Sequence, residues 1–212
     1  MRTLRFYFDY ISPYAYLAWT QIHALADRHG VAVEPVPVLF AAMLDAHGTK
    51  GPAETPARRH YLVRDIARIA HRFGVPVVPP PAHPFNPLLA LRVTYLAAEP
   101  RALIDDLYRA TWATGEGVAD PAVVARIASA HGIPDIAAAQ TMKERVRTET
   151  ADAIARGLFG VPSIVVDDQL FWGCDSLPHL DHYLAHGDVV SAEIIARWDQ
   201  LPAGAVRTRS QG

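Results

Sequence analysis

The sequence predicts an α/β fold in which a strand-helix-strand unit and a strand-strand-helix unit flank a long helical segment. Three observations support this prediction. Residues 4–39 have the patterns of a strand, a helix and a second strand. Residues 41–157 carry apolar side chains mostly at helical spacing, and strand patterns return over residues 160–172. A helical crossover between the first two strands implies that they are parallel. With 212 residues, half of them hydrophobic, the chain suits one domain with an insertion.

The first strand leads into a helix start. Residues 4–10 are rich in aromatic side chains and predict a short buried strand. Ser12 is a candidate N-cap, Pro13 suits the first helical position, and Gly30 is a suitable helix end. The pattern therefore places a hydroxyl at the tip of a strand and at the positive end of a helix, where an anion is stabilised.

The second strand is expected at residues 31–39, where two prolines favour a sheet edge. Residues 43–56 are rich in glycine and proline and predict a surface loop, and the proline-heavy residues 75–87 predict extended chain. Helices are expected in the rest of the insert, at residues 57–73, 88–98, 101–114, 121–131 and 134–156.

The last part of the chain predicts a hairpin followed by helices. Residues 164–166 and 169–172 are strand-like, and Asp167-Asp168 between them suit a turn. Helices follow at residues 177–185 and about 189–200, before a polar tail. This order is the thioredoxin-like layout, β-α-β … β-β-α, with a large all-helical insertion. The expected domains are a discontinuous thioredoxin-like domain (residues 1–40 and 158–212) and a helical insertion domain (residues 41–157).

Composition argues against several classes of protein. Twenty Lys and Arg balance 22 Asp and Glu, so no basic excess favours nucleic acid. No apolar run approaches the ~18 residues needed to span a membrane, and Asp9 and Pro13 interrupt the only run that resembles a signal peptide. Cys174 is the single cysteine, so neither an internal disulfide nor a cysteine-rich metal site can form, and no metal is expected. We therefore expect a reducing, cytoplasmic setting.

The strand-helix tip suggests the chemistry. Thioredoxin-like folds carry Cys-x-x-Cys there, but here Ser12 takes the place of the first cysteine, which excludes dithiol redox chemistry. A serine hydroxyl can still donate a hydrogen bond to the thiolate of an external thiol such as glutathione. Lowering a thiol pKa by two units takes roughly 2.7 kcal/mol. A helix N-terminus offers at most ~2 kcal/mol and a hydrogen bond to a charged group ~1.5–3 kcal/mol, so together they suffice. The alternative is that Ser12 only caps the helix.

Two further motifs support a thiol-peptide site. Val161-Pro162 precedes a buried strand, where thioredoxin-like proteins hold a cis peptide bond and pair the preceding backbone with the bound thiol peptide. An ordinary trans proline is the alternative. Gly173-Cys174-Asp175 begins a helix, where backbone N–H groups and Asp175 could bind a γ-glutamyl carboxylate and ammonium. Here the alternative is a simple N-cap, and Cys174 is expected to be a buried side chain rather than a nucleophile.

Taken together, these motifs resemble the 2-hydroxychromene-2-carboxylate isomerase family, which is related to kappa-class glutathione transferases and the oxidoreductase DsbA. The resemblance covers essentially the whole chain and rests on residues 6–18, 157–163 and 170–175, with 61–65 and 83–87 in the insert. By this resemblance Ser12 holds the glutathione thiolate, Val161 pairs with the cysteinyl backbone beside Pro162, and Cys174 and Asp175 bind the γ-glutamyl end.

The resemblance also implies residues in the insert. Lys50 lies in the loop where relatives place a lysine or asparagine that faces the site, and Arg58 lies where kappa-class enzymes have a lysine, so the resemblance implies that both bind glutathione. Lys50, Arg58 and Arg59 are candidate cations for the substrate carboxylate, and a solvated surface is the alternative for all three. Asn86 could face the substrate or cap a helix.

The function implied is a glutathione-dependent isomerase that interconverts 2-hydroxychromene-2-carboxylate and trans-o-hydroxybenzylidenepyruvate, in aromatic hydrocarbon breakdown. Glutathione would be a cofactor, the substrate a small aromatic, and the enzyme a homodimer. A kappa-class-like transferase that conjugates electrophiles is the first alternative, and it would consume glutathione. A non-catalytic glutathione-binding module is the second. A DsbA-like oxidoreductase is disfavoured because Cys174 has no partner cysteine.

Overall fold

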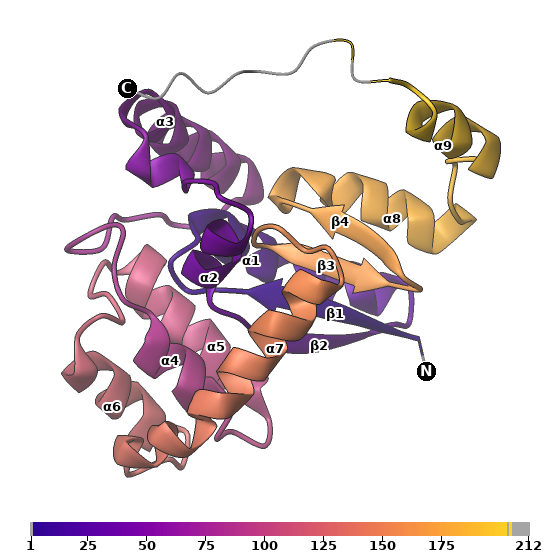
Figure 1. The fold of residues 1–212 in the computed structure, drawn as a ribbon. Coiled ribbons are helices and arrows are strands. Elements are labelled where there is room, and N and C mark those ends of the chain that lie inside the picture. Colours follow the sequence, from indigo (N-terminus) through magenta and orange to yellow (C-terminus); the bar gives the residue numbers. More distant parts are fainter. Residues whose placement is uncertain (1, 203, 205–212) are drawn as a thin grey trace.

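The computed structural model describes residues 2–202 and 204, and in that range it contains one four-stranded sheet with helices packed on both faces (Figure 1). The strand order is β2-β1-β3-β4, with β1–β2 parallel and the β1–β3 and β3–β4 pairs antiparallel. This arrangement confirms the predicted thioredoxin-like fold with a helical insertion. The strands are β1 (Thr3–Phe8), β2 (Ala32–Pro37), β3 (Ser163–Val166) and β4 (Gln169–Trp172).

Helices α2 to α7 lie between β2 and β3 in the chain, and α8 and α9 follow the hairpin (Figure 1). Their bounds are α1 (Pro13–Arg28), α2 (Phe40–Ala46), α3 (Pro56–Phe73), α4 (Leu88–Thr94), α5 (Pro100–Tyr108), α6 (Pro121–Ala130), α7 (Lys143–Ala155), α8 (Leu177–His186) and α9 (Ala192–Asp199). None of the described helices is both long enough and apolar enough to cross a lipid bilayer.

Strand β1 is central and is buried on both faces of the sheet. Its side chains alternate, as the two-residue period of a strand requires. Leu4, Phe6 and Phe8 pack into the larger core cluster, together with side chains of α1 and of the insert helix α5. Tyr7 points the other way, into a smaller cluster that includes Met43 of α2 and Ala153 of α7. The insert therefore shares its core with the sheet.

Two element predictions need correction. The segment 43–56 was expected to be a loop, but α2 continues to Ala46 and a short 3₁₀ turn spans Pro52–Glu54. The N-terminal amide of α2 is bound by a residue distant in the sequence, because Phe40 N–H donates to the Asp9 side chain at 2.9 Å. No local sequence pattern indicates this contact. The helix expected at residues 134–156 divides into a 3₁₀ segment, Ile136–Met142, and α7. The tail beyond residue 204 lies outside the described residues.

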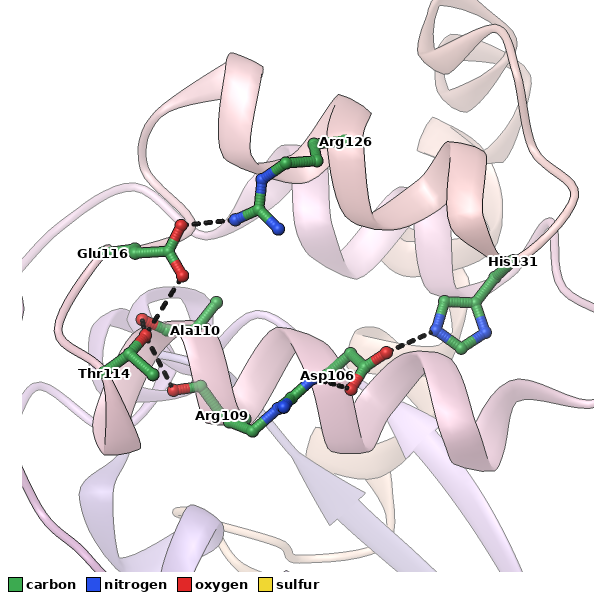
Figure 2. Close-up of polar contacts among 7 residues, drawn as sticks. All are labelled: Asp106, Arg109, Ala110, Thr114, Glu116, Arg126 and His131. Carbon is green, nitrogen blue, oxygen red and sulfur yellow. Dashed lines mark hydrogen bonds and ion pairs between the residues drawn. The ribbon is translucent and has the colours of Figure 1, made fainter.

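Ion pairs join the helices of the insert at its surface (Figure 2). His131, just after α6, lies 2.8 Å from the carboxylate of Asp106 on α5, and Arg109 contacts the same carboxylate at 2.7 Å. Burial alone would raise the pKa of Asp106, but the hydrogen bonds from His131 and Arg109 outweigh it and lower that pKa. Glu116, in the segment between α5 and α6, pairs with Arg126 of α6. Together with the His131–Asp106 contact, this pair joins α6 to neighbouring parts of the insert.

Asp9, which directly follows β1, links the loop before α1 to the start of α2. Its side chain is fully buried and accepts the N–H groups of Ile11 at 3.1 Å and Phe40 at 2.9 Å. Burial raises the pKa of this carboxyl to about 7, although the backbone hydrogen bonds act in the opposite direction. The folded protein therefore holds a proton on Asp9 at pH values where an unfolded chain, with an aspartate pKa of about 3.9, has released it.

We predict that this proton makes stability depend on pH. Because the folded state binds more protons between about pH 4 and pH 7, the free energy of unfolding falls as pH rises through that range and is level above it. Between about pH 5 and pH 8 the Asp9 contribution should fall by about 2.7 kcal/mol, two pKa units. Urea unfolding of the wild type and Asp9→Asn at both pH values measures this change.

The control is Glu144→Gln. Glu144 is exposed, and its pKa is lowered by the hydrogen bond from Arg147, so it stays ionised throughout this pH range. The stability difference between this variant and the wild type should not change with pH. If Asp9→Asn gives the same constant difference, the buried carboxyl does not hold a proton near neutral pH.

Candidate active site

A cavity of about 890 Å³ lies where the tip of β1, the start of α1, the turn before β3 and the end of β4 meet the insert. Its size is within the range of small-molecule sites. Most of the predicted site residues line it, namely Ser12, Lys50, Arg58, Val161, Cys174 and Asp175. Pro162 is buried directly behind Val161, and Arg59 and Asn86 are not among the residues that line the cavity.

Ser12 caps α1 and also contacts the turn before β3. Its Oγ accepts the N–H of Ala15 at 3.1 Å, which is the N-cap interaction. The same hydroxyl donates to the carbonyl of Val161 at 3.3 Å, and the side chain is buried. Since the cap uses only a lone pair of Oγ, the proton can turn from the Val161 carbonyl to an acceptor in the cavity without loss of the cap. The capping role and a catalytic role are therefore compatible.

The turn before β3 presents its backbone to the cavity. The Val161–Pro162 peptide is cis, as the resemblance implied. The Val161 carbonyl accepts from Ser12, and within residues 2–202 and 204 its N–H has no hydrogen-bond partner. Gly173 N–H donates to the Pro162 carbonyl at 2.9 Å, which brings the end of β4 against this turn. An extended peptide could pair with Val161 as an added strand.

Cys174 lies in the wall of the cavity but is not a reactive thiol. Only 2% of the residue is exposed. Burial, with a smaller contribution from the charges of Asp175 and Asp65, raises the pKa of the thiol to about 12. Gly173 precedes it with a φ of 86°, and a Cβ there would come within 2.4 Å of an Asp175 carboxylate oxygen. Glycine is therefore required where the chain turns from β4 toward α8.

One face of α3 lines the cavity, and apart from Arg58 its residues were given no role from the sequence. Arg58, Tyr61, Asp65, Ile69 and Arg72 recur every three or four residues and line the cavity. This face binds α1 directly, because the hydroxyl of Tyr14 donates to the Asp65 carboxylate at 2.7 Å. Both signs of charge gather near Cys174: Asp65 and Asp175 raise its pKa, whereas Arg72 lowers it. A helical polar stripe on α3 was the available sequence signal.

Aromatic side chains from separate segments complete the walls. Phe40 of α2 and Phe85 of the extended segment line the cavity together with Phe159 and Trp172, whose rings lie 5.0 Å apart. Trp172 is 52% exposed, which is unusual for so large an apolar side chain. These residues are far apart in the sequence and share no local pattern, so only the fold brings them together.

The remaining predicted residues have other surroundings. Asn86 accepts the N–H of Leu88, the first residue of α4, at 3.0 Å, although the N-cap residue of that helix is Pro87. Arg59 is exposed on α3, and its charge lowers the pKa of His83. His83 itself lines the cavity, although sequence reasoning gave it no role. Lys50 and Arg58 are exposed side chains at the cavity wall.

Comparisons with known proteins agree with this geometry. The family model of the DSBA-like thioredoxin domain matches residues 3–185. A 2-hydroxychromene-2-carboxylate isomerase from Pseudomonas putida is 32% identical over 81% of this chain and 89% of its own length. Glutathione S-transferase kappa 1 from Homo sapiens is 23% identical over 86% of this chain and 91% of its own. A solved structure of a 2-hydroxychromene-2-carboxylate isomerase shares the fold, with a TM-score of 0.79 at 24% identity, over 93% of this chain and 97% of that one.

The environment of Cys174 predicts an unreactive thiol. In native protein near neutral pH, iodoacetamide should modify Cys174 at least tenfold more slowly than in urea-unfolded protein, because burial raises the thiol pKa to about 12. Mass spectrometry of timed samples gives both rates. Equal rates in the two states would show that Cys174 is exposed and reactive, and would restore it as a candidate nucleophile.

Proposed function

The chain belongs to the DSBA-like thioredoxin domain family and, within it, to the 2-hydroxychromene-2-carboxylate isomerase family, and from this premise we propose that it is a glutathione-dependent isomerase. Its reaction would interconvert 2-hydroxychromene-2-carboxylate and trans-o-hydroxybenzylidenepyruvate in the breakdown of aromatic hydrocarbons. The observation that carries the proposal is the Ser12 hydroxyl, 3.3 Å from the Val161 carbonyl in the wall of a large cavity. At this point of the cavity, a helix N-terminus, a hydroxyl donor and the backbone N–H of Val161 lie together.

The residues of the cavity fit glutathione. The N–H of Val161, which has no partner among the described residues, can donate to the carbonyl of a bound tripeptide. Near Cys174, Asp175 and Asp65 can attract an ammonium group while Arg72 attracts a carboxylate, which matches the zwitterionic γ-glutamyl end. Arg58 precedes Arg72 by fourteen residues on α3, roughly 21 Å along the helix axis. Two long arginine side chains could therefore reach the two ends of a bound tripeptide.

When bound, glutathione supplies a thiolate that adds reversibly to the conjugated carbon of the ring-opened substrate, so that a double bond becomes a single bond that can rotate. Ser12 would turn its proton from the Val161 carbonyl toward that sulfur and so lower the thiol pKa. The first turn of α1 favours negative charge at the same place. Because the thiolate adds reversibly, glutathione is not consumed, which suits a cofactor role.

The substrate would occupy the part of the cavity formed by the insert. Its carboxylate would bind Lys50, a predicted cation that lines the cavity, because Arg58 is placed at one end of the tripeptide. Phe40 and Phe85 offer apolar walls for an aromatic ring. Arg59 and Asn86 do not line the cavity, so we assign the substrate contacts to the other residues. The homodimer implied by family resemblance and the cytoplasmic location expected from the single cysteine stay predictions.

A kappa-class-like transferase is the second candidate, and the similarity to glutathione S-transferase kappa 1 favours it. The same Ser12 hydroxyl would serve it, but glutathione would leave as a conjugate. A non-catalytic glutathione-binding module is the third candidate. The stoichiometry of thiol separates all three, because an isomerase conserves it, a transferase consumes it and a binding module forms no product.

The proposal is tested by following 2-hydroxychromene-2-carboxylate spectrophotometrically, with and without catalytic glutathione, while total thiol is measured. We predict product only with glutathione and no loss of thiol. Ser12→Ala should lower the rate tenfold or more, because one charge-assisted hydrogen bond of about 1.5 kcal/mol is lost. Ser12→Cys should keep part of the activity.

The matched control is Ser191→Ala. Ser191 caps α9 through its hydroxyl, which accepts the N–H of Ile194 at 3.2 Å, and it does not line the cavity. Its loss should change stability by about 1 kcal/mol and leave the rate unchanged. Full activity in Ser12→Ala would remove Ser12 from the mechanism, and thiol lost in step with product would make the enzyme a transferase.

A further inference from the structure

His83 lines the same cavity as Ser12 and is bound next to it. Its Nε2 lies 2.9 Å from the carbonyl of Ile11, the residue that directly precedes Ser12. A carbonyl only accepts hydrogen bonds, so Nε2 carries the proton and the neutral ring leaves a lone pair on Nδ1. Within the described residues Nδ1 has no hydrogen-bond partner, and it is not among the buried, unsatisfied side-chain atoms. Nδ1 therefore keeps some accessible surface.

The ring is fixed by aromatic neighbours. Trp112 meets His83 edge to face at 5.4 Å, and Phe85 lies 6.2 Å away. Trp112 in turn donates its indole N–H to the carbonyl of Tyr10 at 2.8 Å. The loop that carries Ser12 is thus held at successive carbonyls by Trp112 and His83. Such a fixed imidazole is prearranged for proton transfer.

His83 is the cavity-lining group best suited to exchange a proton near neutral pH. Burial lowers its pKa, and the charge of Arg59 on α3 adds to this, against the hydrogen bond to Ile11. The ring is therefore neutral and basic at pH 7. Other candidates are engaged or mismatched. Asp65 accepts the Tyr14 hydroxyl, and the thiol pKa of Cys174 is about 12.

The proposed substrate needs such a group, because its first step is a proton exchange. In 2-hydroxychromene-2-carboxylate, carbon 2 bears a hydroxyl, a carboxylate and the ring oxygen, so it is a cyclic hemiketal. Ring opening removes the hydroxyl proton, and the O–H electron pair forms the new C=O bond. The bond from carbon 2 to the ring oxygen breaks, and its electron pair goes to that oxygen, which then takes up a proton. One proton leaves and one returns, with no oxidation.

We propose that His83 is the catalytic acid–base group of this ring opening and of its reverse. Nδ1 takes the proton from the hemiketal hydroxyl and returns it to the phenolic oxygen, while Nε2–H stays on the Ile11 carbonyl. This inference rests on the proposed isomerase function and adds to it a residue and a step that do not involve the thiol.

The experiment compares the pH dependence of kcat for the wild type, His83→Gln and His47→Gln, at saturating glutathione. Glutamine keeps an N–H donor for Ile11 but has no base, so kcat should fall on the order of 10²-fold while KM changes little. Acidification should lower wild-type kcat in two steps, protonation of the bound thiol and protonation of His83 through a pKa below 6.5. His83→Gln should keep the thiol step and lack the His83 step, so that its plot of log kcat against pH is less steep at low pH by one unit. In His83→Ala, added imidazole should partly restore kcat.

His47→Gln is the matched control. His47 also contacts a backbone carbonyl, that of Leu158 at 3.1 Å, but it does not line the cavity. It should behave as the wild type does. Asp9 is a second titratable group near this loop, since its carboxylate binds the amide of Ile11. A plot of log kcat against pH that is equally steep in His83→Gln and the wild type would assign the second step to Asp9 and overturn the role of His83.

The outcomes separate the two proposals. A wild type that forms no product overturns the isomerase function and this inference with it. A wild type that isomerises, alongside a His83→Gln variant with unchanged kcat, overturns the role of His83 alone. Nitrogen-15 NMR of the wild type needs no variant: the ring must be neutral and protonated on Nε2 at pH 7. A ring protonated on Nδ1 or on both nitrogens would contradict the proposal.

Discussion

The hydrogen bond between the Ser12 hydroxyl and the Val161 carbonyl joins two points 149 residues apart in the sequence. It connects the start of α1 to the turn before β3, and the sheet makes it possible by pairing β1 with β3. The end of β4 is held beside this contact, because the N–H of Gly173, which follows β4, donates to the carbonyl of Pro162, the residue after Val161. The cavity lies where these segments meet. A bound thiol that replaces this contact would meet a hydroxyl, a helix N-terminus and a strand-like edge together.

The insert depends on the same region for its position. Asp9 binds Ile11 beside Ser12 with one carboxylate oxygen and the first amide of α2 with the other. Trp112 and His83 bind the carbonyls of Tyr10 and Ile11. The loop after β1 is thus held by hydrogen bonds to the buried carboxyl of Asp9 and to two side chains of the insert, Trp112 and His83. The insert helices therefore contribute to the geometry of the site as well as to the pocket for a substrate.

Much of the fold and part of the candidate site could be predicted from the sequence, because short local patterns indicate them. The aromatic-rich strand expected at residues 4–10, the cap at Ser12 and the hairpin at Asp167-Asp168 each have a local signal, and the structure has all three, with β1 at Thr3–Phe8. Features that depend on distant contacts could not be predicted. Helix α2 takes its N-terminal partner from Asp9, and the placement of His83 and Trp172 in one wall requires the folded chain. Asn86 accepts the N–H of Leu88, the first residue of α4.

The central claim is that Ser12 holds a glutathione thiolate, and the pKa of the bound thiol tests it most directly. Thiolate absorbance in the ultraviolet can be titrated for glutathione bound to the wild type and to Ser12→Ala. A hydrogen bond of about 1.5–3 kcal/mol should lower the bound thiol pKa by one to two units from about 8.5, and most of that shift should vanish in the variant. A thiol pKa that is unchanged on binding, or equally lowered in both proteins, would contradict the account.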